Sequence, residues 1–275
     1  MILDSSKYLE IINPGIARGQ IRHALFDFDG TLSLIREGWQ EIMISMMVEL
    51  LLQTPRHESE MELRTLVTGF VDLLTGRQTI YQMIQLAEEV DKRGGEAQDP
   101  VAYKWLYLER LWTKIEGRVE GLRTGRLNRQ SLMVPGAVQI LEAMRDRGVT
   151  CYLASGTDKV YVLDEADVLG LSGYFAGIYG ALDDYQSYSK KMVIDRILSE
   201  NNLNGSQLVT FGDGYVEIED TKSVGGIAVG VATDEATRQG VDEWKRERLI
   251  AAGADLIVPD FGQHQQLVAY LFEGS

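Results

Sequence analysis

Two aspartates separated by one residue follow an apolar run, in the stretch Asp27-Phe28-Asp29-Gly30-Thr31. The apolar run is typical of a buried strand, which we expect over residues 24–28. Residues two apart on a strand face the same side, and Gly30 permits a sharp turn at the strand end. Crowded carboxylates repel one another unless a proton or a cation compensates, and oxygen ligands suit Mg²⁺. The stretch therefore predicts a divalent-metal site at a strand tip.

Two less specific interpretations of this stretch also exist. An Asp-x-Asp-Gly turn can be a solvated loop, or part of a calcium-binding loop. A calcium loop of the EF-hand kind requires further oxygen ligands at alternate positions and a closing Glu. Ser33 and Leu34-Ile35 do not supply that pattern, so the calcium interpretation is the weaker one.

A second polar turn follows another apolar run, where Leu153-Ala154 leads into Ser155-Gly156-Thr157. A hydroxyl and free backbone N–H groups at a strand-to-helix junction suit a phosphate oxygen. Ser and Thr are also common helix N-caps, and on this segment alone capping is the better interpretation.

Two more segments add candidate charges. Leu208 to Phe211 leads into Gly212-Asp213-Gly214, with Glu217 four residues after Asp213, and a turn aspartate is the simpler alternative there. Ser189-Lys190-Lys191 opens a helical pattern. The helix macrodipole disfavours a cation at a helix start. Either these lysines are solvated, or one of them is placed there to bind an anion and pair with Asp27.

The elements that must position these residues alternate along the second half of the chain. We expect strands at 150–154, 177–179, 208–211, 227–231 and 256–258, and helices at 137–147, 160–169, 191–201 and 235–252. Alternation of this kind predicts a Rossmann-like, doubly wound parallel sheet that includes the strand at 24–28. Ligands of such sheets bind at the carboxyl ends of the strands, which is where Asp27 and Asp29 fall.

Between Thr31 and Pro135 the strand pattern is replaced by helical periodicity. Four apolar stripes at helical spacing begin at Trp39, Leu63, Ile80 and Trp105. Strand-to-helix loops normally have only a few residues. We therefore expect an inserted all-helical domain at 33–134, and a core that carries the sheet, formed by 1–32 and 135–275.

Composition limits the class of protein. The 275 residues carry a formal net charge of −14, with 45% hydrophobic and 25% charged residues, as in a globular enzyme. Such a charge disfavours nucleic-acid and anionic-membrane partners but not a small phosphorylated substrate. The single cysteine, Cys151, excludes an intramolecular disulfide. Because no stretch has the pattern of a signal peptide or a membrane span, we expect a cytoplasmic protein.

The order of these four motifs resembles the haloacid dehalogenase superfamily, over essentially the whole chain. The resemblance implies that Asp27 is the nucleophile that becomes phosphorylated and that Asp29 is the general acid/base. It implies Mg²⁺ as the cofactor, with Asp27, Asp29, Asp213 and Glu217 as the metal-site residues. It also implies that Ser155, Gly156 and Thr31 bind the phosphate, and that Lys190, with Lys191 as the fallback, neutralises it.

Differences in the motif residues between members of the superfamily indicate which reaction to expect. Dehalogenases and phosphonate-cleaving members lack the second aspartate, which is present here as Asp29. A phosphatase acting on a small phosphorylated metabolite is therefore the leading hypothesis. A sugar-phosphate mutase is the second, and a non-catalytic regulatory relative is the third.

The resemblance also implies that the inserted helical domain is the superfamily's cap, which should select the substrate. The loop Thr75-Gly76-Arg77-Gln78-Thr79 is the candidate contact, with Arg77 and Gln78 as its polar groups. Arg36 and Trp39 are further candidates, although Arg36 could instead be a solvated charge and Trp39 part of the cap core.

Overall fold

The computed structural model describes residues 8–182 and 184–273. It divides into two compact units. The first comprises the chain up to Glu37 together with the chain from Gly121 onward, and the second comprises Gly38–Glu120.

The first unit contains a seven-stranded sheet in the order β1-β7-β6-β5-β2-β3-β4. All neighbouring strands are parallel except β1 and β7, which are antiparallel. The doubly wound α/β class predicted from the sequence is therefore confirmed, whereas the short edge strand β1 was not predicted. The strands are β1 (Glu10–Ile11), β2 (His23–Phe26), β3 (Thr150–Asp158), β4 (Phe175–Ala181), β5 (Leu208–Gly212), β6 (Ile227–Val231) and β7 (Leu256–Val258).

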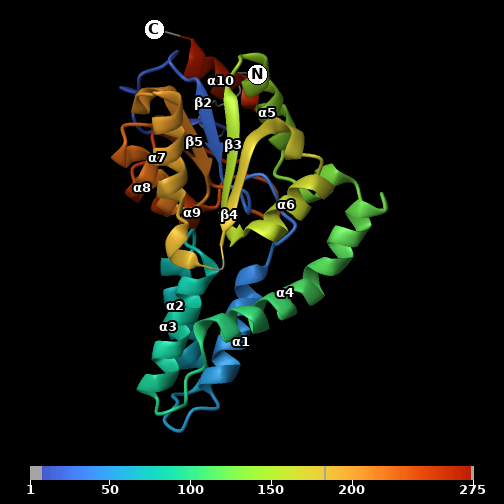
Figure 1. Cartoon of the computed structure of the whole chain (residues 1–275), viewed down its shortest axis with the longest axis vertical. Coiled ribbons are helices and arrows are strands. Elements are labelled where there is room, and N and C mark those ends of the chain that lie inside the picture. The colour runs from blue at the N-terminus through green and yellow to red at the C-terminus, as the bar shows by residue number, and fades with distance from the viewer. Residues whose placement is uncertain (1–7, 183, 274–275) are drawn as a thin grey trace. The chain divides into compact units, whose positions relative to one another are not determined.

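Helices cover both faces of the sheet (Figure 1). Helices α7, α8 and α9 pack on the face that carries Leu25, Tyr152 and Ala228, and α5 packs against β3 and α10. The opposite face holds the aromatic core, in which the rings of Phe26 and Phe211 stack with centroids 4.6 Å apart. The helices are α5 (Ala137–Asp146), α6 (Lys159–Val168), α7 (Lys190–Asn201), α8 (Tyr215–Ser223), α9 (Glu243–Ala251) and α10 (His264–Phe272).

The register of the three central strands determines where their ends meet. Phe26 of β2 pairs with Leu153 of β3 and with Phe211 of β5. Asp27 directly follows Phe26, and its N–H donates to Phe211 O at 2.8 Å. The strand ends at Phe26 rather than at residue 28 as predicted, so both aspartates lie in the loop that follows it.

The predicted helix at 235–252 begins only at Glu243. Asp234 causes the difference, because its side chain accepts hydrogen bonds from the N–H groups of Ala236 and Thr237 and stabilises a turn. Gly240 then adopts a φ of +78°, which a helix does not allow. Helices α8 and α10 were not predicted.

Two segments of the first unit, close to the predicted domain limits, pair with each other. Leu34 N donates to Leu132 O at 2.9 Å, and Val134 N donates to Leu32 O at 3.1 Å. The unit boundaries in the structure, near Glu37 and Gly121, lie inside the predicted limits of 33 and 134. We propose residues 33–134 as the limits of the inserted helical domain.

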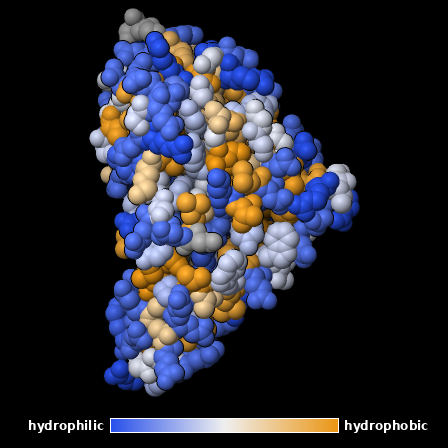
Figure 2. Space-filling view, in the orientation of Figure 1, coloured by the Kyte–Doolittle hydropathy of each residue, from blue (hydrophilic) through white to orange (hydrophobic). Residues whose placement is uncertain are grey.

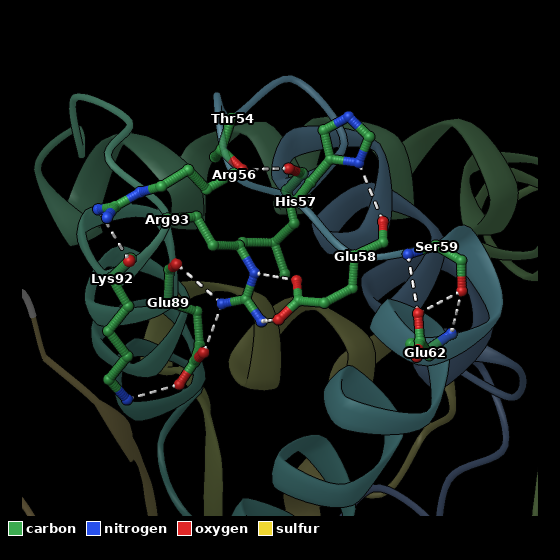
Figure 3. Close-up of polar contacts among 10 residues, drawn as sticks. Thr54, Arg56, His57, Glu58, Ser59, Glu62, Glu89, Lys92 and Arg93 are labelled. Carbon is green, nitrogen blue, oxygen red and sulfur yellow. Dashed lines mark hydrogen bonds and ion pairs between the residues drawn. The ribbon is translucent and has the colours of Figure 1, made fainter.

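The second unit consists of α1 (Trp39–Leu51), α2 (Glu60–Leu74), α3 (Thr79–Lys92) and most of α4 (Pro100–Arg123). The buried side chain of Arg93 connects the segment before α2 with α3 in this unit. The Arg93 guanidinium donates to both carboxylate oxygens of Glu58, at 2.6 and 2.8 Å, and to Glu89 Oε2 at 2.6 Å (Figure 3). Since Glu58 precedes α2 and Glu89 lies in α3, this cluster fixes the start of one helix to the end of another.

The face shown in Figure 2 is largely hydrophilic, with hydrophobic residues in smaller groups. Within the two described ranges, no helix combines the length and the apolar character that crossing a lipid bilayer requires.

Candidate active site

A buried lysine contacts the first aspartate of the acidic motif. Lys190 is the first residue of α7, and Ser189 caps that helix. The Lys190 Nζ atom lies 2.9 Å from Oδ1 of Asp27 and 2.9 Å from Oε2 of Glu217. The side chains of all three residues are less than a tenth exposed. A cation that the macrodipole disfavours is thus held by two carboxylates.

The electrostatics of this group are those of a site with excess negative charge. Burial raises the pKa of Asp27 well above its usual value, and Glu217 and Asp213 raise it further, although Lys190 opposes them. Burial alone would lower the pKa of Lys190, but Asp27 and Glu217 reverse this and raise it. The lysine therefore stays charged, and the carboxylates need additional positive charge to ionise together.

Three carboxylates of the group could share a cation. One oxygen each of Asp27, Asp213 and Glu217 lie within 4.8 Å of one another. Asp213 follows β5, and Glu217 lies in the first turn of α8, where its Oε1 accepts a hydrogen bond from Gly214 N at 2.7 Å. Carboxylate oxygens at this separation fit a hard divalent cation such as Mg²⁺.

The second aspartate has a different environment. The Oδ2 atom of Asp29 accepts hydrogen bonds from Thr157 Oγ1 at 2.9 Å and from Ser155 Oγ at 3.4 Å. Its Oδ1 is buried, lies 3.8 Å from Arg36 Nε and has no hydrogen-bond partner in the described structure. Burial raises the pKa of Asp29, while Arg36 and then Thr157 lower it. A raised pKa suits a carboxyl group that must hold a proton at some stage of a reaction.

The turn after β3 lies beside this aspartate. Ser155 is buried, its Oγ accepts a hydrogen bond from Thr157 N at 3.0 Å, and its carbonyl accepts one from the Tyr188 hydroxyl at 2.8 Å. Gly156 is partly exposed. The strand β3 is irregular between Ala154 and Asp158, so the backbone bulges where a phosphate is expected to bind.

A second lysine, which the sequence did not indicate, also reaches the site. Lys245 of α9 places Nζ 2.8 Å from Asp213 Oδ2 and 2.6 Å from Glu235 Oε1. The predicted helix over 235–252 excluded the contact between Glu235 and Lys245, because residues ten apart on one helix cannot meet. The loop around Asp234 is what brings Glu235 and Lys245 together.

The family model described as haloacid dehalogenase-like hydrolase matches residues 21–225. The chain belongs to the haloacid dehalogenase-like hydrolases. The superfamily resemblance inferred from the four motifs is thereby confirmed. No curated protein matches the chain by sequence.

Solved structures similar to this hydrolase share its fold at low sequence identity. A predicted phosphoglycolate phosphatase from Haemophilus somnus has a TM-score of 0.59 and 18% identity, and the match covers 90% of this chain and 98% of that one. A β-phosphoglucomutase from Clostridium difficile has a TM-score of 0.59 and 15% identity, covering 91% and 97%. CbbY from Rhodobacter sphaeroides in complex with phosphate has a TM-score of 0.56 and 16% identity, covering 88% and 96%.

Three more residues predicted for the site, Lys191, Thr31 and Arg36, also belong to the first unit. Lys191 forms an ion pair with Asp195 on its own helix, whereas Lys190 is the one that contacts Asp27. Thr31 is fully buried, and its hydroxyl has no hydrogen-bond partner within the described ranges. Arg36 is buried against Glu165, to which Nη2 donates at 2.6 Å.

The predicted substrate contacts of the cap lie in the second unit. Gln78 is largely buried before α3, and the Arg77 guanidinium lies over the Tyr81 ring, 5.8 Å from its centroid. Gly76 has a φ of +96°, so the loop turns where only glycine does so readily. Trp39 is the first residue of α1. A role for these residues in substrate binding remains a prediction.

Proposed function

We propose that this hydrolase is a Mg²⁺-dependent phosphatase that cleaves a small phosphorylated metabolite through an aspartyl-phosphate intermediate. The observation that carries the proposal is Lys190 held between Asp27 and Glu217, each 2.9 Å away. A phosphate dianion repels an attacking carboxylate, and a fixed ammonium at the nucleophile lowers that repulsion.

In the first step an oxygen of Asp27 attacks phosphorus, and the bond from phosphorus to the leaving oxygen breaks. Asp29 gives its proton to that leaving oxygen. Ser155 and the N–H of Gly156 bind the phosphoryl oxygens, and Lys190 balances their charge. In the second step Asp29 removes a proton from water, the water oxygen attacks phosphorus, and the bond to Asp27 breaks. Splitting one difficult displacement into two lowers each barrier.

The carboxylate oxygens of Asp27, Asp213 and Glu217, with the backbone carbonyl of Asp29, would hold Mg²⁺. When bound, the metal supplies the positive charge that the buried carboxylates and the phosphate require. Within the protein, Glu217 also fixes Lys190, and Lys245 fixes Asp213.

The test is release of inorganic phosphate from a panel of phosphorylated metabolites, with the wild-type protein and Asp27→Asn compared. We expect release by the wild type only with Mg²⁺ and none above a trace by the variant, whose fold is verified by circular dichroism. Phosphorus NMR of the products separates the alternatives. Conversion of one sugar phosphate into another without phosphate release would indicate a mutase, and binding without turnover would indicate a regulatory relative.

A further inference from the structure

The hydroxyl of Tyr188 makes a hydrogen bond to the backbone of the proposed phosphate-binding turn. It donates to the carbonyl oxygen of Ser155 at 2.8 Å. Tyr188 lies before α7 and is buried in a core cluster of the first unit, together with Leu25, Ala154 and Val193. The bond therefore connects this core to the end of β3.

The end of β3 is irregular where this bond is made. The strand pairs with β4 at Ala154 and again at Asp158, and the register shifts between these two positions. Ser155 and Gly156 lie in the irregular stretch. Glycine has access to more backbone conformations than other residues, so the peptide group between Ser155 and Gly156 can rotate unless another contact fixes it.

The Ser155 carbonyl and the Gly156 N–H belong to the same peptide group. A trans peptide group is planar, so its C=O and N–H point in opposite directions, and the described ranges contain no cis peptide bond. A carbonyl held toward Tyr188 therefore directs the Gly156 N–H away from the Tyr188 hydroxyl. On the other side of the turn, Ser155 Oγ accepts a hydrogen bond from Thr157 N at 3.0 Å.

We infer that Tyr188 is a positioning residue that aims the N–H of Gly156 at a phosphate oxygen. It acts through the backbone of the turn and not through its own contact with the substrate. This inference rests on the proposed function, in which the Gly156 N–H binds a phosphoryl oxygen. The competing explanation is that the hydroxyl only satisfies the need of a buried tyrosine for a hydrogen-bond partner.

The first test observes this peptide group by NMR. Ser155-Gly156 and Ser172-Gly173 are the two Ser-Gly pairs of the sequence. Protein made by cell-free synthesis with ¹³C-carbonyl serine and ¹⁵N-glycine therefore gives one HNCO signal for each pair. Tyr188→Phe should move the Ser155-Gly156 signal in its carbonyl and amide dimensions and leave the Ser172-Gly173 signal in place. Inorganic phosphate with Mg²⁺ should move the Gly156 amide of the wild type.

The second test measures phosphate binding by calorimetry, together with steady-state kinetics. Tyr188→Phe keeps the aromatic ring and removes the hydroxyl. Its Kd for inorganic phosphate should rise about 10-fold, the equivalent of losing a weak hydrogen bond to a charged group. KM of the best ester of the panel should rise with it. We expect kcat to change by less than about threefold, because the same contact is made to the substrate and to the transition state.

Tyr152→Phe is the matched control. Tyr152 is a buried tyrosine of the same core cluster, and its hydroxyl accepts a hydrogen bond from Asn201 Nδ2 at 3.5 Å. This variant should keep Kd for phosphate and KM within about twofold of the wild-type values. The Tm of both variants is compared, so that a general loss of stability is recognised.

An unmoved Ser155-Gly156 signal in Tyr188→Phe would overturn the inference. So would a moved signal with Kd for phosphate within about twofold of the wild-type value, or an equal loss of phosphate binding in Tyr152→Phe. Failure of the proposed function would look different: the wild type would release phosphate from no ester of the panel. The NMR and calorimetric measurements need no turnover, and they still decide the role of Tyr188 in a protein that binds phosphate without hydrolysing esters.

Discussion

The ammonium group of Lys190 lies 2.9 Å from Oδ1 of Asp27, with both side chains buried. The neighbouring Lys191 pairs with Asp195 instead. One residue of difference in the chain therefore decides which cation meets the proposed nucleophile. This follows from helix geometry, since adjacent residues of a helix project about 100° apart.

Lys190→Ala should lower kcat by about 10²–10³-fold, the usual cost of losing one fixed electrostatic stabiliser in an active site. Lys191→Ala, the matched control, should change kcat by less than about twofold. Both are measured by phosphate release on the best substrate of the panel. A larger loss in Lys191→Ala than in Lys190→Ala would move the lysine motif by one residue.

Asp29→Asn should reduce steady turnover by about 10²–10⁴-fold, the usual contribution of general acid–base catalysis. An amide neither gives a proton to the leaving oxygen nor takes one from water. With p-nitrophenyl phosphate the first step should partly survive, and mass spectrometry of the quenched protein should detect phosphorylated Asp27. Steady turnover at the wild-type rate would remove Asp29 from the acid/base role.

EDTA should abolish phosphate release, and added Mg²⁺ should restore it. Mg²⁺ at 100 times its Kd stabilises the folded state by about 2.7 kcal/mol, so Tm in a thermal-shift assay should rise with Mg²⁺ concentration. Asp213→Asn should lose most of that rise, because Asp213 supplies one of the three clustered carboxylates. Activity that persists in EDTA would contradict the metal assignment.

Arg77→Ala and Gln78→Ala should lower kcat/KM on the best metabolite by the equivalent of about 1–3 kcal/mol, the cost of losing a hydrogen bond to a charged group. Hydrolysis of p-nitrophenyl phosphate should barely change, since a small artificial ester lacks the groups that the cap loop would recognise. Equal losses on both substrates would assign the loop to fold or closure. Loss on neither would place specificity elsewhere, with the Arg123-Arg126-Arg129 segment next to be tested.

Asp220 of α8 gives a prediction for stability against pH. Burial, and then the neighbouring Glu217, raise the pKa of Asp220 to about 6 in the folded protein, against 3.8 as its ordinary value. The folded state therefore binds the proton more tightly than the unfolded state, and the free energy of unfolding falls as pH rises between those two values. Below pH 3.8 this penalty is absent.

Asp220→Asn should accordingly stabilise the protein by about 1 kcal/mol at pH 8, after allowing for solvent screening of a half-buried group, and not at pH 4. Urea unfolding at both pH values in EDTA measures the difference. The exposed neighbour Glu219→Gln serves as the control. A gain of the same size at both pH values would show that removing the charge is not the cause.

The sequence alone determined the sheet class and four clusters of candidate residues, for physical reasons that act locally. Buried parallel strands tend to be continuous apolar runs, as Ile227–Val231 is, and helices on both faces must alternate with them. Asp27, Ser155 and Asp213 could be placed at one edge because parallel strands end on the same side. The helical stripes between Thr31 and Pro135 likewise indicated an insertion.

The tertiary structure decided the contacts between residues far apart in the chain. Lys245 meets Glu235 only because Asp234 and Gly240 replace the predicted helix by a loop. Arg36 meets Glu165 across 129 residues, and no local pattern marks either residue as a partner of the other. Strand periodicity and helix stripes report which face a residue occupies, whereas ion pairing depends on packing between elements, which a single sequence does not encode locally.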